Sequence, residues 1–464
     1  VLYRMISYGC QVIANIDGDD AKQLHKAFKF ARTRDKKCFI DCRTHFAYGT
    51  KQKVDSYSDH GSPLGISEKQ ALRDNLNWTH DPFVVPEELL QQWQIQDCLA
   101  DEQKWQTLFQ EYETQYPELA IEFKRRFTKQ LNGKTIKTLD DLLLEYNEKM
   151  PYLATRAVNK IVLQAIANTT QELIGGAADL AGSTGILADT NKAITATDAS
   201  GNFIYFGVRE FAMAAIMTGI SVYGCCIPYG ATFFAFLHYN VSALRTIALM
   251  KQQAIYIFTH DSFYVGEDGP THQPIEHLSL LRSMPNVELW RPCDTVETIF
   301  AWQQALKTIN KPTVLILSRQ KLPTIARNKL QLANMSKGAY ILYQNYTIEE
   351  SPTILLLATG SEVSLAINVA KNLQMKARVV SLPSTTVFDA QNEQYKNTIL
   401  LDNSIKLKVA IEAGHELSWY KYLCQDDLII AINEFGESAK GEDLADYFGF
   451  TTKKILAKIH KKLF

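Results

Sequence analysis

The most reactive side chains of the sequence gather between Thr259 and Pro274, where the chain reads T-H-D-S-F-Y-V-G-E-D-G-P-T-H-Q-P. This segment holds two histidines, two aspartates and one glutamate, and its two glycines and two prolines predict a stiff loop. His260 and His272 can move protons near neutral pH, and Asp268 can orient a hydroxyl group. A polar surface loop is the simpler alternative, but this density of functional groups favours a binding or catalytic site.

An apolar run directly precedes this loop. Residues Ala254–Phe258 read A-I-Y-I-F, which is typical of a buried strand. In open α/β sheets, ligands bind at the carboxyl ends of the strands. We therefore expect the loop to lie at a ligand site.

A glutamate opens a long uncharged segment upstream of this loop. Glu210 ends the sequence G-V-R-E, and no charged residue occurs in the 27 positions of Phe211–Leu237. A carboxylate beside so apolar a run is costly unless it binds something. We expect a buried Glu210 that makes a strong hydrogen bond to a basic nitrogen of a cofactor; the alternative is a surface ion pair with Arg209.

Three aromatic residues in the same region are spaced three apart: Phe233, Phe236 and Tyr239. This spacing predicts that they share one face of a helix. They form either a core stripe or an exposed aromatic wall for a flat heterocycle.

Other candidates for ligand binding are a small-residue turn and two arginines. Gly175–Ser183 reads G-G-A-A-D-L-A-G-S after the strand-like Leu173–Ile174, and this turn can bring the backbone and Ser183 close to a ligand. Arg156 and Arg319 are candidate phosphate-binding forks, or else members of structural ion pairs. Neither G-x-G-x-x-G nor G-x-x-x-x-G-K-[ST] occurs, which disfavours the dinucleotide and P-loop classes.

Bulk composition excludes several classes of partner. The 464 residues carry 49 Lys and Arg against 50 Asp and Glu, a balance that gives no reason to expect a nucleic-acid or membrane partner. The eight cysteines include no C-x-x-C pair, which indicates free thiols in a reducing compartment, mostly buried. Glycines and a proline divide Phe211–Leu237, so we expect a helix, a short strand and a loop buried in a large core rather than a membrane span.

The order of patterns predicts several α/β domains. Residues 1–75 contain strand patterns at Gln11–Ile16 and Cys38–Cys42 around a helix, and residues 76–150 look like a helical connector. Residues 151–330 and 338–464 each alternate strand and helix signals. The predicted fold class is therefore α/β, with three-layer domains built on mostly parallel sheets.

Taken together and in order, these segments resemble transketolase, the thiamine-diphosphate-dependent family. The resemblance runs essentially end to end and rests on N-I-D-G-D-D at 15–20, H-G-S-P-L-G at 60–65, A-T-R at 154–156, G-G-A-A-D-L at 175–180, V-R-E-F-A-M at 208–213, T-H-D-S at 259–262, G-E-D-G-P-T-H-Q-P at 266–274, W-R-P-C-D at 290–294, L-S-R-Q at 317–320 and A-T-G-S-E-V at 358–363. The resemblance implies a partial diphosphate-binding domain (1–75), a pyrimidine-binding domain (151–330) and a C-terminal domain (338–464).

The resemblance also implies an activity and its partners. It implies reversible transfer of a two-carbon ketol unit, held covalently on thiamine diphosphate, from a ketose phosphate such as xylulose 5-phosphate to an aldose phosphate such as ribose 5-phosphate, in the pentose phosphate pathway. It further implies a cytoplasmic homodimer with the active site at the subunit interface. Related thiamine enzymes, deoxyxylulose-phosphate synthase or dihydroxyacetone synthase, and an inactive dimerising fragment are the alternatives.

The resemblance assigns roles to individual residues. Glu210 would pair with the aminopyrimidine of the cofactor, and His272 and His60 would assist proton transfer. The other cofactor contacts would be Phe233, Phe236, Tyr239, His60, Asp179 and Leu180. The substrate contacts would be Arg156, Ser183, His260, Asp268, His272, Arg319 and His60.

The sequence departs from the family pattern at several points. The usual T-P-S-N appears as A-G-S-T around Ser183, T-H-x-x-H-G appears as S-Y-S-D-H-G at 56–61, and Lys321 replaces an asparagine. The diphosphate- and metal-binding motif that begins G-D-G and ends in Asn is not found. We therefore expect a truncated gene product or an incomplete sequence, with the ligands of Mg²⁺ (or Ca²⁺) in the missing N-terminal region.

Overall fold

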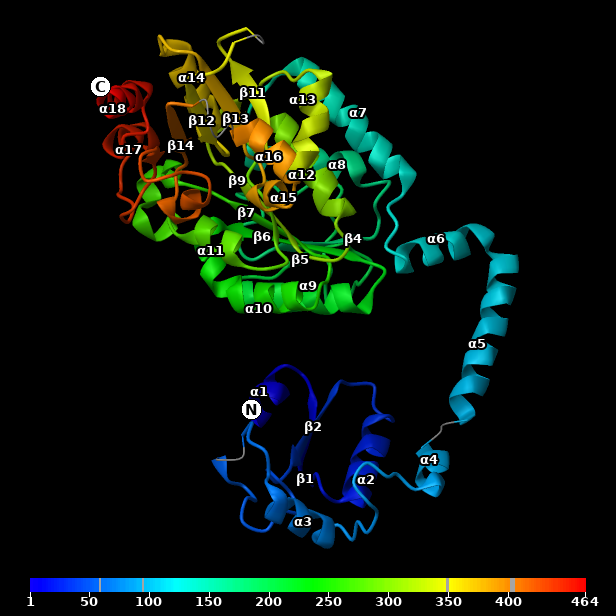
Figure 1. The fold of residues 1–464 in the computed structure, drawn as a ribbon. Helices are drawn as coiled ribbons and strands as arrows, with labels where there is room; N and C mark the ends of the chain where they lie inside the picture. Colours follow the sequence, from blue (N-terminus) through cyan, green and yellow to red (C-terminus); the bar gives the residue numbers. More distant parts are fainter. Residues whose placement is uncertain (58–59, 94–95, 348–349, 401–404) are drawn as a thin grey trace. The chain divides into compact units, whose positions relative to one another are not determined.

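A computed structural model describes residues 1–57, 60–93, 96–347, 350–400 and 405–464 (Figure 1). The chain divides into two compact units, Val1–Glu111 and Tyr112–Phe464. Ser58 and Asp59, which belong to the S-Y-S-D-H-G motif, lie outside the described residues. None of the described helices combines the length and the apolar character that crossing a bilayer requires.

The first unit is a small α/β element. Its strands β1 (Gln11–Asp17) and β2 (Cys38–Arg43) pair in parallel, which confirms the two strands predicted here. Asp20 begins the helix between them by accepting hydrogen bonds from the backbone N–H groups of Lys22 and Gln23. Its helices are α1 (Leu2–Ser7), α2 (Ala21–Ala31), α3 (Ile66–Asn75), α4 (Glu87–Trp93) and the larger part of α5 (Gln96–Gln115).

The second unit is built on two larger sheets. The central sheet has six strands, all parallel, in the order β5-β4-β6-β7-β9-β8. These strands are β4 (Leu173–Ala177), β5 (Phe203–Tyr205), β6 (Ile227–Phe233), β7 (Ile255–Thr259), β8 (Glu288–Trp290) and β9 (Thr313–Leu317). A short antiparallel pair joins β3 (Tyr152–Ala154) to β10 (Lys321–Pro323).

Helices cover both faces of the central sheet (Figure 1). Alternate residues of β7 point to opposite faces: Ile255 and Ile257 enter one core, and Tyr256 and Phe258 enter another. The first core includes residues of α7 (Gly133–Lys149), α8 (Thr155–Ile166) and α12 (Thr295–Lys307). The second includes residues of α9 (Glu210–Tyr223), α10 (Leu237–Leu249) and α11 (His277–Ser283). The predicted three-layer α/β fold is confirmed.

The C-terminal sheet repeats this plan. Its order is β11-β13-β12-β14-β15, with β11 antiparallel and the other strands parallel. The strands are β11 (Tyr340–Gln344), β12 (Ile354–Ala358), β13 (Ala377–Ser381), β14 (Leu407–Ile411) and β15 (Leu428–Ile430). The helices are α13 (Lys329–Asn334), α14 (Glu362–Asn372), α15 (Thr385–Asp389), α16 (Glu393–Leu400), α17 (Gly441–Tyr447) and α18 (Thr452–Leu463), and α6 (Pro117–Phe127) precedes both sheets.

Three expectations from the sequence are wrong. Gly175 and Gly176 lie inside β4 rather than in a turn. Glycine is needed at these positions because a side chain would collide with the backbone of a neighbouring strand, at Tyr229 or Ile204. The segment Phe211–Leu237 is not wholly buried, because α9 packs on the sheet with one side only and exposes apolar residues on the other. Most cysteines are not buried either: all eight are free, and among them only Cys293 is fully enclosed.

Candidate functional site

The candidate residues of the second unit come from the carboxyl ends of neighbouring strands. Because the six strands are parallel, these ends meet at one edge of the central sheet. Asp179, Leu180 and Ser183 follow β4, Glu210 follows β5, Phe233 ends β6, His260 follows β7 and Arg319 follows β9. The predicted loop after a buried strand is thus confirmed, with its strand shifted by one residue to Ile255–Thr259.

The loop that begins at His260 is held in a fixed shape. His260 has a φ of 64°, a left-handed conformation that few residues other than glycine adopt. Two short 3₁₀ turns follow, Phe263–Asp268 and Pro270–His272. The buried Gln273 amide donates to Gly266 O at 2.9 Å and to Glu437 O at 2.8 Å, so one side chain ties the loop to the C-terminal part of the unit.

A row of aromatic rings lies beside this loop. The Phe233 and Phe236 rings stack with centroids 6.2 Å apart, and the Phe236 and Tyr239 centroids are 6.3 Å apart. His260 lies against Phe233, and His272 meets Phe236 edge-on at 5.5 Å. Both predicted histidines therefore contact the aromatic row.

The prediction that the three aromatic residues share one helix is wrong. Phe233 ends β6, Phe236 belongs to the 3₁₀ turn Phe234–Phe236, and Tyr239 lies in the first turn of α10. Residues three apart stay adjacent here because a 3₁₀ turn repeats every three residues. Phe233 is buried, whereas Tyr239 is exposed, so neither the core-stripe nor the exposed-wall alternative describes the whole row.

Four basic side chains lie close enough to influence one another. Burial, together with the positive charges of Arg156, Arg319 and His272, lowers the pKa of His260 to about 3. Burial and the charge of Arg319 likewise lower the pKa of Arg156. His260 is therefore neutral at physiological pH, and the two guanidinium groups form a cationic surface suited to an anion.

Glu210 occupies the first position of α9 and is buried. Arg209 is turned away from it and donates to Phe206 O at 3.0 Å. Among the described residues, no hydrogen bond or ion pair involves the Glu210 carboxylate, and so the alternative of an Arg209–Glu210 pair is wrong. A glutamate that is only 7% exposed, and whose carboxylate has no partner in the described part of the chain, can bind a ligand.

A cavity of about 740 Å³ lies between the loop after β7 and the C-terminal part of the unit. Asp268 and Arg319 line it, together with Lys321, Ser361 and Lys440. Its size suits a small metabolite. Ser361 and Lys440 were not named from the sequence as lining residues: Ser361 lies in the A-T-G-S-E-V motif but received no role, and Lys440 belongs to no motif.

The remaining candidates are placed less directly. The Ser183 side chain is exposed, and the Ser183 carbonyl accepts a hydrogen bond from Arg156. Asp179 is exposed and Leu180 is half-buried beyond the end of β4. His60 belongs to the first unit, where it is exposed and stacks on Phe46 with centroids 6.1 Å apart.

Three families of domains match the chain in succession. Residues 1–132 match the transketolase thiamine diphosphate binding domain, residues 152–324 the transketolase pyrimidine binding domain, and residues 338–451 the transketolase-like C-terminal domain. These matches agree with the order of the sheets along the chain.

Individual relatives give the same result. Transketolase 2 of Vibrio parahaemolyticus is 41% identical over 98% of this chain and 68% of its own length. A transketolase of Buchnera aphidicola is 43% identical with the same coverage. A crystal structure of the Pichia stipitis transketolase in complex with sedoheptulose 7-phosphate superposes on the whole chain and on 68% of its own, with a TM-score of 0.89 and 32% identity. The chain described here belongs to the transketolase family.

Proposed function

We propose that this chain takes part in ketol transfer, moving a two-carbon unit reversibly from a ketose phosphate to an aldose phosphate in the pentose phosphate pathway. The observation that carries the proposal is a group of four basic residues beside an aromatic row at one sheet edge: His260, which is neutral, with His272, Arg156 and Arg319. A sugar phosphate needs this combination: cations for its phosphate and neutral hydrogen-bonding groups for its hydroxyls.

Each side chain has a proposed part in this reaction. Arg156 and Arg319 hold the phosphate, and Ser183 is placed beside Arg156 for the same purpose. His260 and Asp268 orient sugar hydroxyls, while His272, set edge-on to Phe236, moves a proton at the reacting oxygen. His60 would add a second proton-transfer group from the first unit.

The donor set fits thiamine diphosphate, a cofactor with one flat ring and one basic ring nitrogen. Glu210 offers a buried carboxylate without a protein partner, and Phe233, Phe236 and Tyr239 offer ring faces. Asp179 and Leu180 complete the proposed contacts at the end of β4. When bound, the cofactor supplies the carbanion that carries the two-carbon unit between sugars.

We further propose that Mg²⁺ (or Ca²⁺) accompanies the cofactor diphosphate. These ions need several oxygen ligands. Among the described residues, the one group of three metal-type ligands contains two histidines, which does not suit either ion. The proposal of a separate ligand set for the diphosphate therefore stands on the family resemblance alone.

A homodimer in a reducing compartment such as the cytoplasm is part of the same proposal. The side of α9 opposite its buried residues exposes Phe211, Ile216 and Val222. Exposed apolar surfaces of this kind commonly pair with another subunit. The proposed domain boundaries are 1–75, 76–150, 151–330 and 338–464.

The decisive experiment combines cofactor binding with turnover. The purified chain is titrated with thiamine diphosphate and Mg²⁺, and ketol transfer from xylulose 5-phosphate to ribose 5-phosphate is then measured. We expect Glu210→Ala to lower kcat by at least about 100-fold while the fold persists, because one positioned acid–base group contributes about 10²–10⁴-fold. Glu118→Ala is the matched control, since Glu118 also lies in the first turn of a helix, α6, but is exposed.

Three outcomes separate the alternatives. Turnover that survives in Glu210→Ala contradicts the role given to this carboxylate. Dimer formation without cofactor binding or turnover favours the inactive dimerising fragment. Turnover with glyceraldehyde 3-phosphate and pyruvate, or with formaldehyde as acceptor, in place of ribose 5-phosphate favours a related thiamine enzyme.

A further inference from the structure

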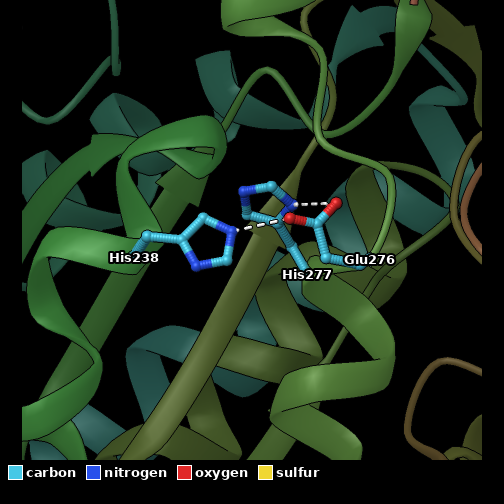
Figure 2. A group of neighbouring side chains, drawn as sticks. All are labelled: His238, Glu276 and His277. Atoms are coloured by element: carbon cyan, nitrogen blue, oxygen red, sulfur yellow. Dashed lines mark hydrogen bonds and ion pairs between the residues drawn. The ribbon is translucent and has the colours of Figure 1, made fainter. Parts of the chain in front are cut away.

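Three side chains capable of binding a metal lie together at the start of α10 and α11. Figure 2 shows His238, Glu276 and His277 with their rings and carboxylate turned toward one another. His238 Nε2 and Glu276 Oε1 are 2.8 Å apart, and His277 Nδ1 and Glu276 Oε2 are 3.7 Å apart. One ligand atom from each residue lies within 4.8 Å of the others.

The buried histidine of this group has one nitrogen without a partner. His277 is 5% exposed, and its Nε2 faces Ala235 O at 3.3 Å. Because a carbonyl oxygen only accepts, Nε2 must carry the proton of the neutral ring, and Nδ1 then carries the lone pair. This Nδ1 is buried without a hydrogen-bond partner among the described residues, yet it points at the Glu276 carboxylate.

A simple surface ion pair does not explain this arrangement. His238 and Glu276 are each about half exposed and could pair with each other alone. That pairing leaves the His277 Nδ1 lone pair unsatisfied beside an acceptor-only carboxylate, which is unfavourable. A cation between the three groups would satisfy all of them, and a backbone carbonyl that orients the other ring nitrogen is a usual feature of metal-bound histidine.

We propose that His238, Glu276 and His277 form a binding site for Zn²⁺. Two imidazoles and one carboxylate are a zinc donor set, and imidazole selects zinc-like ions over Mg²⁺ or Ca²⁺. Tetrahedral zinc places its ligand atoms roughly 3.4 Å apart. The separations of 2.8 Å and 3.7 Å lie on either side of this value but end on different oxygens of Glu276, and all three ligand atoms lie within 4.8 Å of one another. Rotations of the two half-exposed side chains can therefore close the site. Three ligands leave the fourth position to water.

The site has a structural consequence close to the aromatic row. His238 lies between Phe236 and Tyr239 in the chain, and Glu276 follows His272 by four residues. Bound zinc therefore fastens the first turn of α10 to the start of α11, beside the rings proposed to hold the cofactor. Any ligand that binds only the folded state also raises its thermal stability.

The test is a Zn²⁺ titration of the complete chain after treatment with a chelator, in excess Mg²⁺ and without substrate. We expect one Zn²⁺ per chain and a rise in the unfolding temperature. We expect Co²⁺ in place of Zn²⁺ to give visible absorption bands of nitrogen- and oxygen-bound cobalt. Absence of binding in the presence of Mg²⁺ would overturn the proposal.

Variants assign the binding to these residues. We expect His238→Ala to weaken Zn²⁺ at least about 10-fold, since even partners of metal ligands change affinity about 10–100-fold. His238 is half exposed, so its loss leaves the fold intact. His460→Ala is the matched control, because His460 is an exposed helical histidine that packs against Phe464 far along the chain. Equal affinity in His238→Ala and His460→Ala contradicts the site.

Discussion

The two units of the molecule share an α/β pattern but differ in how much they bury. In the second unit, strands such as β7 and β12 are buried along their whole length, with helices on both faces. Among the described residues of Val1–Glu111, Ala27 is the only apolar residue that is buried. The residues proposed to bind the sugar phosphate in the second unit are therefore supported by a large core, whereas His60 belongs to a unit with almost none.

The two-stranded sheet of the first unit leads us to expect a low free energy of unfolding for this unit. Such a sheet is marginally stable in water, and three or more strands or a packed helix are usually needed. The unit lies within residues 1–132, which match a thiamine diphosphate binding domain. The two units should therefore unfold separately.

Amide hydrogen exchange measures this difference directly and has the largest expected effect. We expect amides of β1 and β2 to exchange with opening free energies lower by several kcal/mol than those of β7 and β12, which approach the global value of about 5–15 kcal/mol. The measurement uses the complete chain and mass spectrometry of peptides from each strand. Equal protection of β1 and β7 would contradict the comparison.

The two units also differ in how deeply their ion pairs are buried. In the second unit Arg291 is 1% exposed and donates to Asp261 at 2.7 Å and to Glu362 at 2.6 Å. Arg291 also joins the two sheets, because Glu362 begins α14 beyond β12. In the first unit, Lys104 and Asp101 are 2.9 Å apart but more than two-thirds exposed.

Removing one member of each pair should give unequal losses. We expect Arg291→Met to lower the free energy of unfolding by about 3–5 kcal/mol, because two buried carboxylates lose their counter-ion. Lys104→Met is the matched control and should change it by about 0–1 kcal/mol. Urea titrations check both: the fluorescence of buried tryptophans such as Trp290 follows the second unit for Arg291→Met, and circular dichroism follows both units for Lys104→Met. Similar midpoints for the two variants would refute the contrast.

Much of the fold followed from local patterns in the sequence. The strand Ile255–Thr259 was predictable because the chain there is a short apolar run that ends at a loop rich in turn residues. The position of His260 and Arg319 at one edge of the central sheet also followed, since parallel strands place their carboxyl ends together.

What could not be predicted depends on contacts between distant segments. A spacing of three residues occurs in both α-helices and 3₁₀ turns. The periodicity of Phe233, Phe236 and Tyr239 therefore could not predict that the chain passes from a strand through a 3₁₀ turn into a helix. His238 and Glu276 are 38 residues apart, and no motif joins them. The half-buried state of several cysteines likewise depends on which faces another element covers.

Two histidines make the units respond to pH in opposite directions. Burial and the neighbouring positive charges lower the pKa of His260 to about 3, below the ordinary 6.5, so between these values the unfolded chain holds the extra proton. The stability that neutral His260 provides is complete above pH 6.5 and falls by about 1.4 kcal/mol per pH unit on acidification. In the first unit the Asp55 hydrogen bond raises the pKa of exposed His45, so its contribution is present below pH 6.5 and is lost as the pH rises.

Replacement of each histidine isolates these contributions, which are the smallest of the expected effects. His260→Asn keeps a residue that tolerates the left-handed backbone, and it should flatten the loss of stability of the second unit between pH 7 and 5. His45→Asn should leave that slope unchanged. Urea titrations at both pH values give the slopes. A wild-type slope in His260→Asn would contradict the prediction. It would mean that water reaches the His260 ring in the wild-type protein, so that its burial is weaker than the core of the second unit indicates.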